Sequence, residues 1–147
     1  RETLEIVPEA IPVLPGQRAL LVQGADGADS ITLDGPANLL RWDGAAWQAQ
    51  TVTPADLGLR ACSWTLQKTE QDAETAQQIT ALLRGEVRDA RRDVLLANTA
   101  AALWVSGQAE DLADGVSLAA SRLDQGDGAR RLEALQTLHR DAVREKG

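Results

Sequence analysis

The feature that most constrains the fold of this chain is a change in hydrophobic periodicity near residue 70. Before that point, short runs alternate between apolar and polar residues, which favours β-strands. After it, apolar residues recur every three to four positions, which favours amphipathic helices. A strand-rich region over residues 18–60 followed by a helical region over residues 70–145 predicts an α/β fold. In this fold a strand and a β-hairpin precede four packed helices.

The strand-rich region contains several signals of extended structure. Leu20–Gln23 belongs to a compact apolar run between glycines, and we expect it to form an inner strand. Ser30–Asp34 alternates in the manner of a strand. Asn38–Val52 consists of two runs that flank Asp43-Gly44, a dipeptide suited to the positive φ angle of a hairpin turn. Pro54–Gly58 should close the region with a turn or a single helical turn.

Four helices are predicted from their apolar faces and from the residues that flank them. Aspartates can satisfy the free N–H groups at a helix start, and glycine readily adopts the left-handed conformation beyond a helix end. The short connections should make consecutive helices pack against one another. The expected helices are Ala73–Arg84 with Asp72 as its cap, Asp89 or Arg91 to Ser106, Glu110–Asp124, and Ala129–Arg144 with Leu132, Leu135, Leu138 and Ala142 on its apolar face.

The size and composition of the chain exclude several classes of protein. With 147 residues, the chain can form a single domain over residues 1–147 but not two. A net charge of −7 argues against nucleic acid and an anionic membrane as partners, and no apolar run is long enough to span a bilayer. Cys62 is the only cysteine, which excludes an internal disulfide and suits the reducing cytoplasm. The four tryptophans are interpreted as packing residues: Trp42, Trp47, Trp64 and Trp104.

Most residue types that carry chemistry are absent or isolated. His139 is the only histidine and is expected on a polar helix face, so neither a zinc site nor histidine-dependent catalysis is supported. The segment 26–29 loosely resembles a calcium loop but lacks the required spacing and terminal glutamate. An arginine group around the start of the second helix could hold a phosphate, but interleaved acidic residues favour ion pairs within the group. These residues are Arg84, Arg88, Arg91 and Arg92, with Glu86, Asp89 and Asp93 between them.

Asp29 is the exception, because its position suggests a ligand. It lies in a glycine-bearing loop just beyond the strand expected at residues 20–23. In open α/β sheets, ligands bind at the carboxyl ends of the strands. A loop carboxylate there could hold Mg²⁺, which takes one or two carboxylates and completes its coordination with phosphate oxygens and water. Residue type alone equally allows an aspartate that only forms a turn.

Several segments, in order, resemble the anthranilate phosphoribosyltransferases. Residues 18–36 are similar to the family segment R-A-L-V-V-H-G … G-L-D-E-I-S-L-x-G-P, and residues 53–59 to T-P-E-D-F-G-L. The similarity resumes at Leu83–Glu86, and residues 92–104 resemble R-D-x-V-L-L-N-A-A-A-A-L-Y. Gly107 and Leu112–Val116 fit the turn and helix that follow in the family. The resemblance therefore extends over nearly the whole chain from Arg18 onward.

The resemblance implies part of a phosphoribosyltransferase large domain and an enzyme of the glycosyltransferase class. Such an enzyme transfers phosphoribosyl from phosphoribosyl pyrophosphate to anthranilate in tryptophan biosynthesis, with Mg²⁺ as cofactor. The family's metal-binding Asp-Glu pair maps onto Asp29 and Ser30, so Asp29 is the one implied metal ligand. No catalytic residue is assigned within the segment. Gln23 replaces a histidine of the family pattern.

The family's N-terminal portion, with its glycine-rich phosphate-binding loop G-T-G-G-D, is not found in this sequence. We therefore expect a C-terminal segment of a longer enzyme that is inactive alone and exposes apolar surface normally covered by the N-terminal portion. A homodimer remains open as its assembly. The alternative is a non-catalytic relative that serves as a binding or assembly module, for which Ser30 and Gln23 are the evidence. A third interpretation, a related fold acting on nucleosides or nucleic acid, is disfavoured by the acidic charge.

Overall fold

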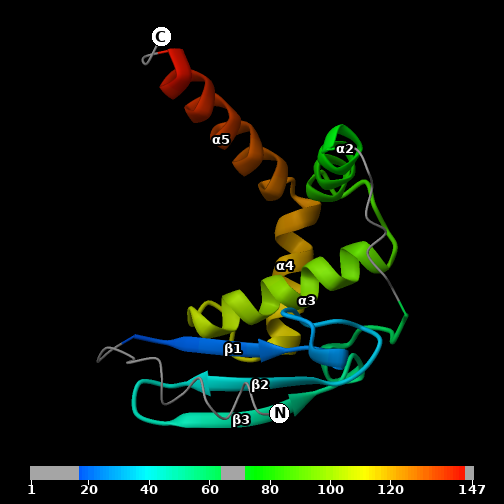
Figure 1. Ribbon diagram of the computed structural model, residues 1–147, viewed down its shortest axis with the longest axis vertical. Coiled ribbons are helices and arrows are strands. Elements are labelled where there is room, and N and C mark those ends of the chain that lie inside the picture. Colours follow the sequence, from blue (N-terminus) through cyan, green and yellow to red (C-terminus); the bar gives the residue numbers. More distant parts are fainter. Residues whose placement is uncertain (1–16, 64–71, 145–147) are drawn as a thin grey trace.

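The computed structural model of the chain describes residues 17–63 and 72–144. Within these ranges, three strands form one antiparallel sheet in the order β1-β2-β3, and four helices follow, with α3 lying along one face of the sheet (Figure 1). The predicted α/β order of a strand, a hairpin and four helices is confirmed. The strands are β1 (Ala19–Gln23), β2 (Ala37–Trp42) and β3 (Trp47–Val52); the helices are α2 (Asp72–Leu83), α3 (Ala90–Val105), α4 (Leu112–Asp124) and α5 (Asp127–Arg144).

The β2–β3 hairpin turns where the sequence predicts. Trp42 pairs with Trp47 at the end of the ladder, and their ring centroids lie 5.5 Å apart. Gly44 has a φ angle of 107°, which side-chain-bearing residues rarely adopt. Asp43 Oδ1 accepts hydrogen bonds from the backbone N–H groups of Ala45 and Ala46 at 2.9 and 3.0 Å. These bonds lower the pKa of Asp43, so its charge stabilises the turn.

The segment after β3 forms the single helical turn that was expected. The 3₁₀ turn η2 covers Ala55–Leu57, and Gly58 follows it in the left-handed conformation. Asp56 Oδ2 accepts hydrogen bonds from both the backbone N–H and the hydroxyl of Thr53, each at 2.7 Å. Leu57 is thereby turned into the core, where it is only 2% exposed.

Two expectations about the strands are wrong in the described part of the chain. β1 pairs with β2 alone, so it lies at an edge of the sheet rather than inside it. A short apolar run does not distinguish these positions, because the burial of Leu20 and Val22 comes from packing against the core. Residues 30–34 form no strand, although Ile31 and Leu33 are each 1% exposed. Their alternation reflects burial of every second side chain, without the ladder that defines a strand.

The centre of the fold is the contact between α3 and α4 above the sheet. Gly115 of α4 packs directly on Ala100 of α3: a Cβ atom at Gly115 would lie 2.9 Å from both Ala100 Cα and Cβ. The Nη2 atom of buried Arg92 lies 3.0 Å from the Asp124 carboxylate and links the start of α3 to the end of α4. Trp104 is 8% exposed, with the Arg41 guanidinium 4.4 Å from its ring centroid. Among the tryptophans, Trp64 lies outside the described residues.

Against the described residues, helix α5 packs mainly through its beginning. Gly128 approaches α2 so closely that a Cβ atom there would lie 2.9 Å from the Leu83 carbonyl oxygen. Beyond this contact the helix extends away from the body of the molecule (Figure 1). The apolar face predicted for this helix is exposed over that stretch, where Leu135 and Leu138 are 64% and 66% exposed. Across the described residues, no helix has both the length and the apolarity that crossing a membrane requires.

Candidate metal-binding loop

The loop from Gly24 to Ser30 follows β1 and is folded tightly on itself. It contains the 3₁₀ turn η1 (Ala25–Gly27), and the Gly24 N–H donates to the Ala28 carbonyl at 2.8 Å. Gly24 is required by space, because a Cβ atom there would collide with the carbonyl oxygen of Ser30. Its φ angle of −71° is ordinary, so contact alone explains the glycine. The sequence predicted a glycine-bearing loop here, but its compact path depends on these contacts.

Helix α3 holds the far end of this loop through Asn98. Asn98 Oδ1 accepts a hydrogen bond from the Ile31 N–H at 3.0 Å. Asn98 Nδ2 donates to the Ile31 carbonyl and to the Val94 carbonyl, each at 2.9 Å. Two residues further on, the Leu33 carbonyl accepts a hydrogen bond from the Cys62 N–H at 2.8 Å. The segment after the loop is therefore bound by a side chain and a neighbouring loop instead of a strand.

Sequence reasoning assigned no role to Asn98. The available signal was an amide among the apolar neighbours of the second predicted helix. Asn98 is next to Ala97, which is fully buried, and two residues before Ala100, which is also fully buried. A polar side chain beside such positions generally needs a hydrogen-bond partner, but the sequence cannot show that the partner is Ile31, 67 positions away.

Asp29 lies exposed on the loop, and Ser30 beside it is partly buried. The sheet is antiparallel, so the carboxyl end of β1 does not belong to a common edge of parallel strand ends. Within residues 17–63 and 72–144, no group of three or more His, Cys, Asp or Glu side chains could hold a metal ion. A solitary exposed carboxylate suits Mg²⁺ only when phosphate oxygens and water supply the other ligands.

Of the predicted arginine group, only Arg91 is paired within the group in the ion pairs of the described residues, and Arg88 and Arg92 are paired outside it. Arg91 Nη2 lies 2.7 Å from Asp89 Oδ2, and hydrogen bonds from Arg91 lower the pKa of Asp89. Arg88 and Arg92 both pair with Asp124 of α4, which the sequence could not indicate. These contacts favour a structural role for this group over a phosphate site. His139 is exposed on α5, in agreement with the interpretation as a surface residue.

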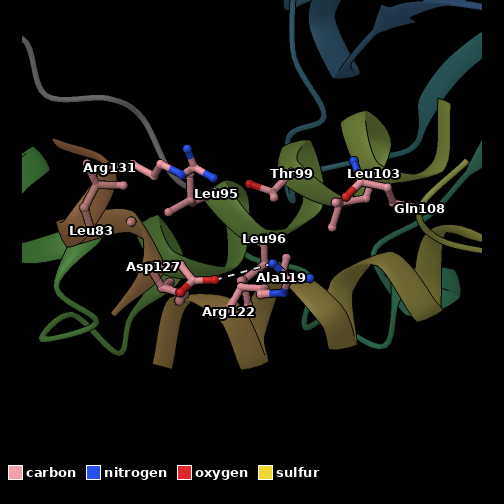
Figure 2. A pocket seen from close by; sticks show the side chains of 12 residues that line it. Leu83, Leu95, Leu96, Thr99, Leu103, Gln108, Ala119, Arg122, Asp127 and Arg131 are labelled. Atoms are coloured by element: carbon pink, nitrogen blue, oxygen red, sulfur yellow. Dashed lines mark ion pairs between the residues drawn. The ribbon is translucent and has the colours of Figure 1, made fainter. Parts of the chain in front are cut away.

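Two hollows among the described residues adjoin α3. One, of about 360 Å³, lies between α2 and α3, with Ser30 and Asn98 in its lining and aliphatic walls that include Ile79, Leu82 and Val94. The other, of about 280 Å³, lies between α3, α4 and the start of α5. Figure 2 shows this second hollow, where Arg122 is paired with Asp127 at 3.5 Å. The first hollow is therefore the one that reaches the Asp29 loop.

The family profile described as glycosyl transferase family, a/b domain, matches residues 1–129. The anthranilate phosphoribosyltransferase of Rhodospirillum rubrum is 41% identical over 127 residues, which are 86% of this chain and 36% of that protein. The Thermus thermophilus enzyme of the same name has a similar structure, with a TM-score of 0.71 and 29% identity over 81% of this chain and 35% of that one.

The Saccharomyces cerevisiae enzyme in complex with PRPP and Mg has the same fold, with a TM-score of 0.68 and 22% identity over 81% of this chain and 34% of that one. The chain spans little more than a third of the length of the curated relatives it matches. The resemblance to anthranilate phosphoribosyltransferases is thus supported in both sequence and structure. The chain belongs to the glycosyl transferase family through its a/b domain.

Proposed function

We infer that this chain is the C-terminal portion of an anthranilate phosphoribosyltransferase, a cytoplasmic enzyme of tryptophan biosynthesis. The observation that carries the proposal is an exposed carboxylate, Asp29, on a loop held by α3 in a chain 41% identical to such an enzyme. The segment forms one domain, residues 1–147. Phosphoribosyl pyrophosphate and anthranilate are bound by the complete enzyme, together with an N-terminal portion, and a homodimer is its proposed assembly.

Asp29 is the residue of this segment that would hold Mg²⁺. When bound, Mg²⁺ neutralises charge on the pyrophosphate as it departs from the ribose. Ser30 provides no anionic oxygen, so the segment contributes one carboxylate rather than two. The role of the loop is to present that carboxylate from a fixed backbone, since positioning and charge stabilisation supply most of the catalysis in such a transfer.

A chimera tests this proposal. In it, the matching segment of the Rhodospirillum rubrum enzyme is replaced by this chain, and loss of anthranilate fluorescence is measured with phosphoribosyl pyrophosphate and Mg²⁺. We expect the chimera to consume anthranilate. Asp29→Ala should lower turnover by roughly 10²–10³-fold, the scale typical of losing one transition-state charge contact. Ala28→Ser, a change beside Asp29 that leaves the carboxylate in place, is the matched control. A folded chimera without turnover, or unchanged turnover and Mg²⁺ dependence in Asp29→Ala, would contradict the assignment.

One observation favours the alternative of a non-catalytic assembly module. Leu135, Leu138 and Val143 of α5 are 58–66% exposed, and together they form an apolar face. Exposed apolar faces commonly mark interaction surfaces. If the chain is such a module, the chimera would fold but show no transferase activity. Restoring the acidic pair with Ser30→Glu would not restore that activity.

A further inference from the structure

We propose that Asn98 is a positioning residue that sets the place of the Asp29 carboxylate by holding the backbone of Ile31. This inference rests on the proposed function, because it assigns a purpose to a contact near the candidate metal ligand. Asn98 lies on α3, and Ile31 is two residues beyond Asp29. The contact therefore acts on the loop from outside it.

The geometry of the contact resembles strand pairing. The amide of Asn98 binds both the N–H and the C=O of Ile31, at 3.0 and 2.9 Å, as an adjacent strand residue would. Because both the N–H and the C=O of Ile31 are bonded, the position and the orientation of its backbone relative to α3 are fixed. A single hydrogen bond would leave the backbone free to rotate about it. With the Ile31 side chain buried at 1% exposure, little freedom remains at this end of the loop.

The Asn98 amide is itself held in one orientation. Nδ2 has two hydrogens, and its contacts with the Ile31 and Val94 carbonyls use both. The Val94 carbonyl belongs to the same helix, so the amide plane is tied to the backbone of α3. That helix is in turn packed on α4 through Ala100 and Gly115 and paired through Arg92 and Asp124. Asn98 thus connects the loop to the most tightly packed part of the fold.

The loop is thereby fixed at both ends. Its beginning continues from β1, whose residue Gln23 is paired with Asn38 of β2. Its far end is fixed by Asn98, and by the Cys62–Leu33 bond beyond it. Mg²⁺ demands a near-ideal arrangement of ligands, so a carboxylate on a pivoting backbone would bind it less well. Partners that orient a metal ligand without touching the metal typically affect affinity by 10- to 100-fold.

The test uses the chimera described above, uniformly ¹⁵N-labelled, with Mn²⁺ and inorganic pyrophosphate as the probe. Paramagnetic broadening of amide signals detects weak binding and identifies the residues around the ion. We expect broadening centred on Asp29 and Ser30 that requires pyrophosphate and is abolished by Asp29→Asn. Asn98→Ala should weaken the apparent Mn²⁺ affinity by roughly 10-fold, the lower end of the range for an orienting partner. Asn98→Asp, which keeps an acceptor for Ile31 but loses both donors, should also weaken it.

A second readout reports the contact without any metal. Hydrogen exchange at the Ile31 amide should accelerate in Asn98→Ala, while the amides of β2 should not change. Val116→Ala, a core change in α4, is the control for a general loss of stability and should leave both readouts at wild-type values.

The outcomes separate the two proposals. If the chimera with the unchanged segment shows no broadening at Asp29, or if Asp29→Asn retains it, the metal assignment fails and the inference fails with it. If Asp29→Asn abolishes the broadening but Asn98→Ala matches the wild type, only the positioning role of Asn98 is overturned. If Val116→Ala lowers the affinity as much as Asn98→Ala, the effect is one of overall stability and the positioning role is again overturned.

Discussion

The crossing of α3 and α4 leads to a prediction with a definite magnitude for Gly115→Ala. The added methyl group would lie 2.9 Å from Ala100 Cα and Cβ and 3.0 Å from its carbonyl oxygen. Ordinary contacts begin near 3.4 Å, and two of these three atoms belong to the backbone. The helices must therefore move apart by several tenths of an ångström, which disturbs the packing around Leu96 and Leu112, both 5% exposed.

Overpacking of this kind costs about 1–3 kcal/mol, whereas replacing a helical glycine by alanine gains about 1 kcal/mol. The expected net loss is therefore up to about 2 kcal/mol, equivalent to a fall in Tm of up to roughly 8 °C for a chain of this size. Thermal and urea unfolding, followed by far-ultraviolet circular dichroism, measure this change. Ala113→Gly, at an exposed position of the same helix, measures the propensity contribution separately. A raised Tm in Gly115→Ala would refute the tight crossing.

Three further predictions concern the site, the charges and the exposed face. In the chimera, Ser30→Glu should restore the acidic pair and lower the Mg²⁺ concentration needed for half-maximal turnover; an unchanged requirement would mean that position 30 does not reach the metal. Hydrogen bonds from Arg91 lower the pKa of Asp89. The charged pair therefore stabilises the fold at pH values above 3.8, the ordinary pKa of aspartate, and this stabilisation is lost as the pH falls through the lowered pKa. Asp89→Asn should therefore lose less stability than the wild type in urea unfolding between pH 4 and pH 2, and a parallel loss would contradict this. Leu135→Lys should change the unfolding free energy of the chain by no more than about 0.5 kcal/mol, because the side chain is 64% exposed, whereas Leu123→Ala at 6% exposure should cost about 2–5 kcal/mol. Similar losses in both would show that α5 is buried in solution.

Local signals predicted the secondary structure well where the cause is local. The Asp43-Gly44 turn requires a positive φ angle, and Asp89 caps α3 by accepting from the Arg91 N–H. Both depend on residues within a few positions of each other, so the sequence displays them directly. The position of β1 at the sheet edge and the exposure of Leu138 depend on which distant segments become neighbours, which apolar patterning does not encode.

The sequence by itself determined the α/β class, the hairpin, the limits of most helices and the family, because turn chemistry, capping and ordered motifs are properties of short segments. It also placed Asp29 in a glycine-bearing loop. Only the tertiary structure decided what holds that loop: Asn98 meets Ile31 across 67 positions, and Gly24 makes room for the Ser30 carbonyl. The physical reason is that hydrogen bonds and close contacts between distant segments arise from packing. The side-chain amide of a helical residue can bind the backbone of many different segments, and only the tertiary fold determines which segment lies beside it.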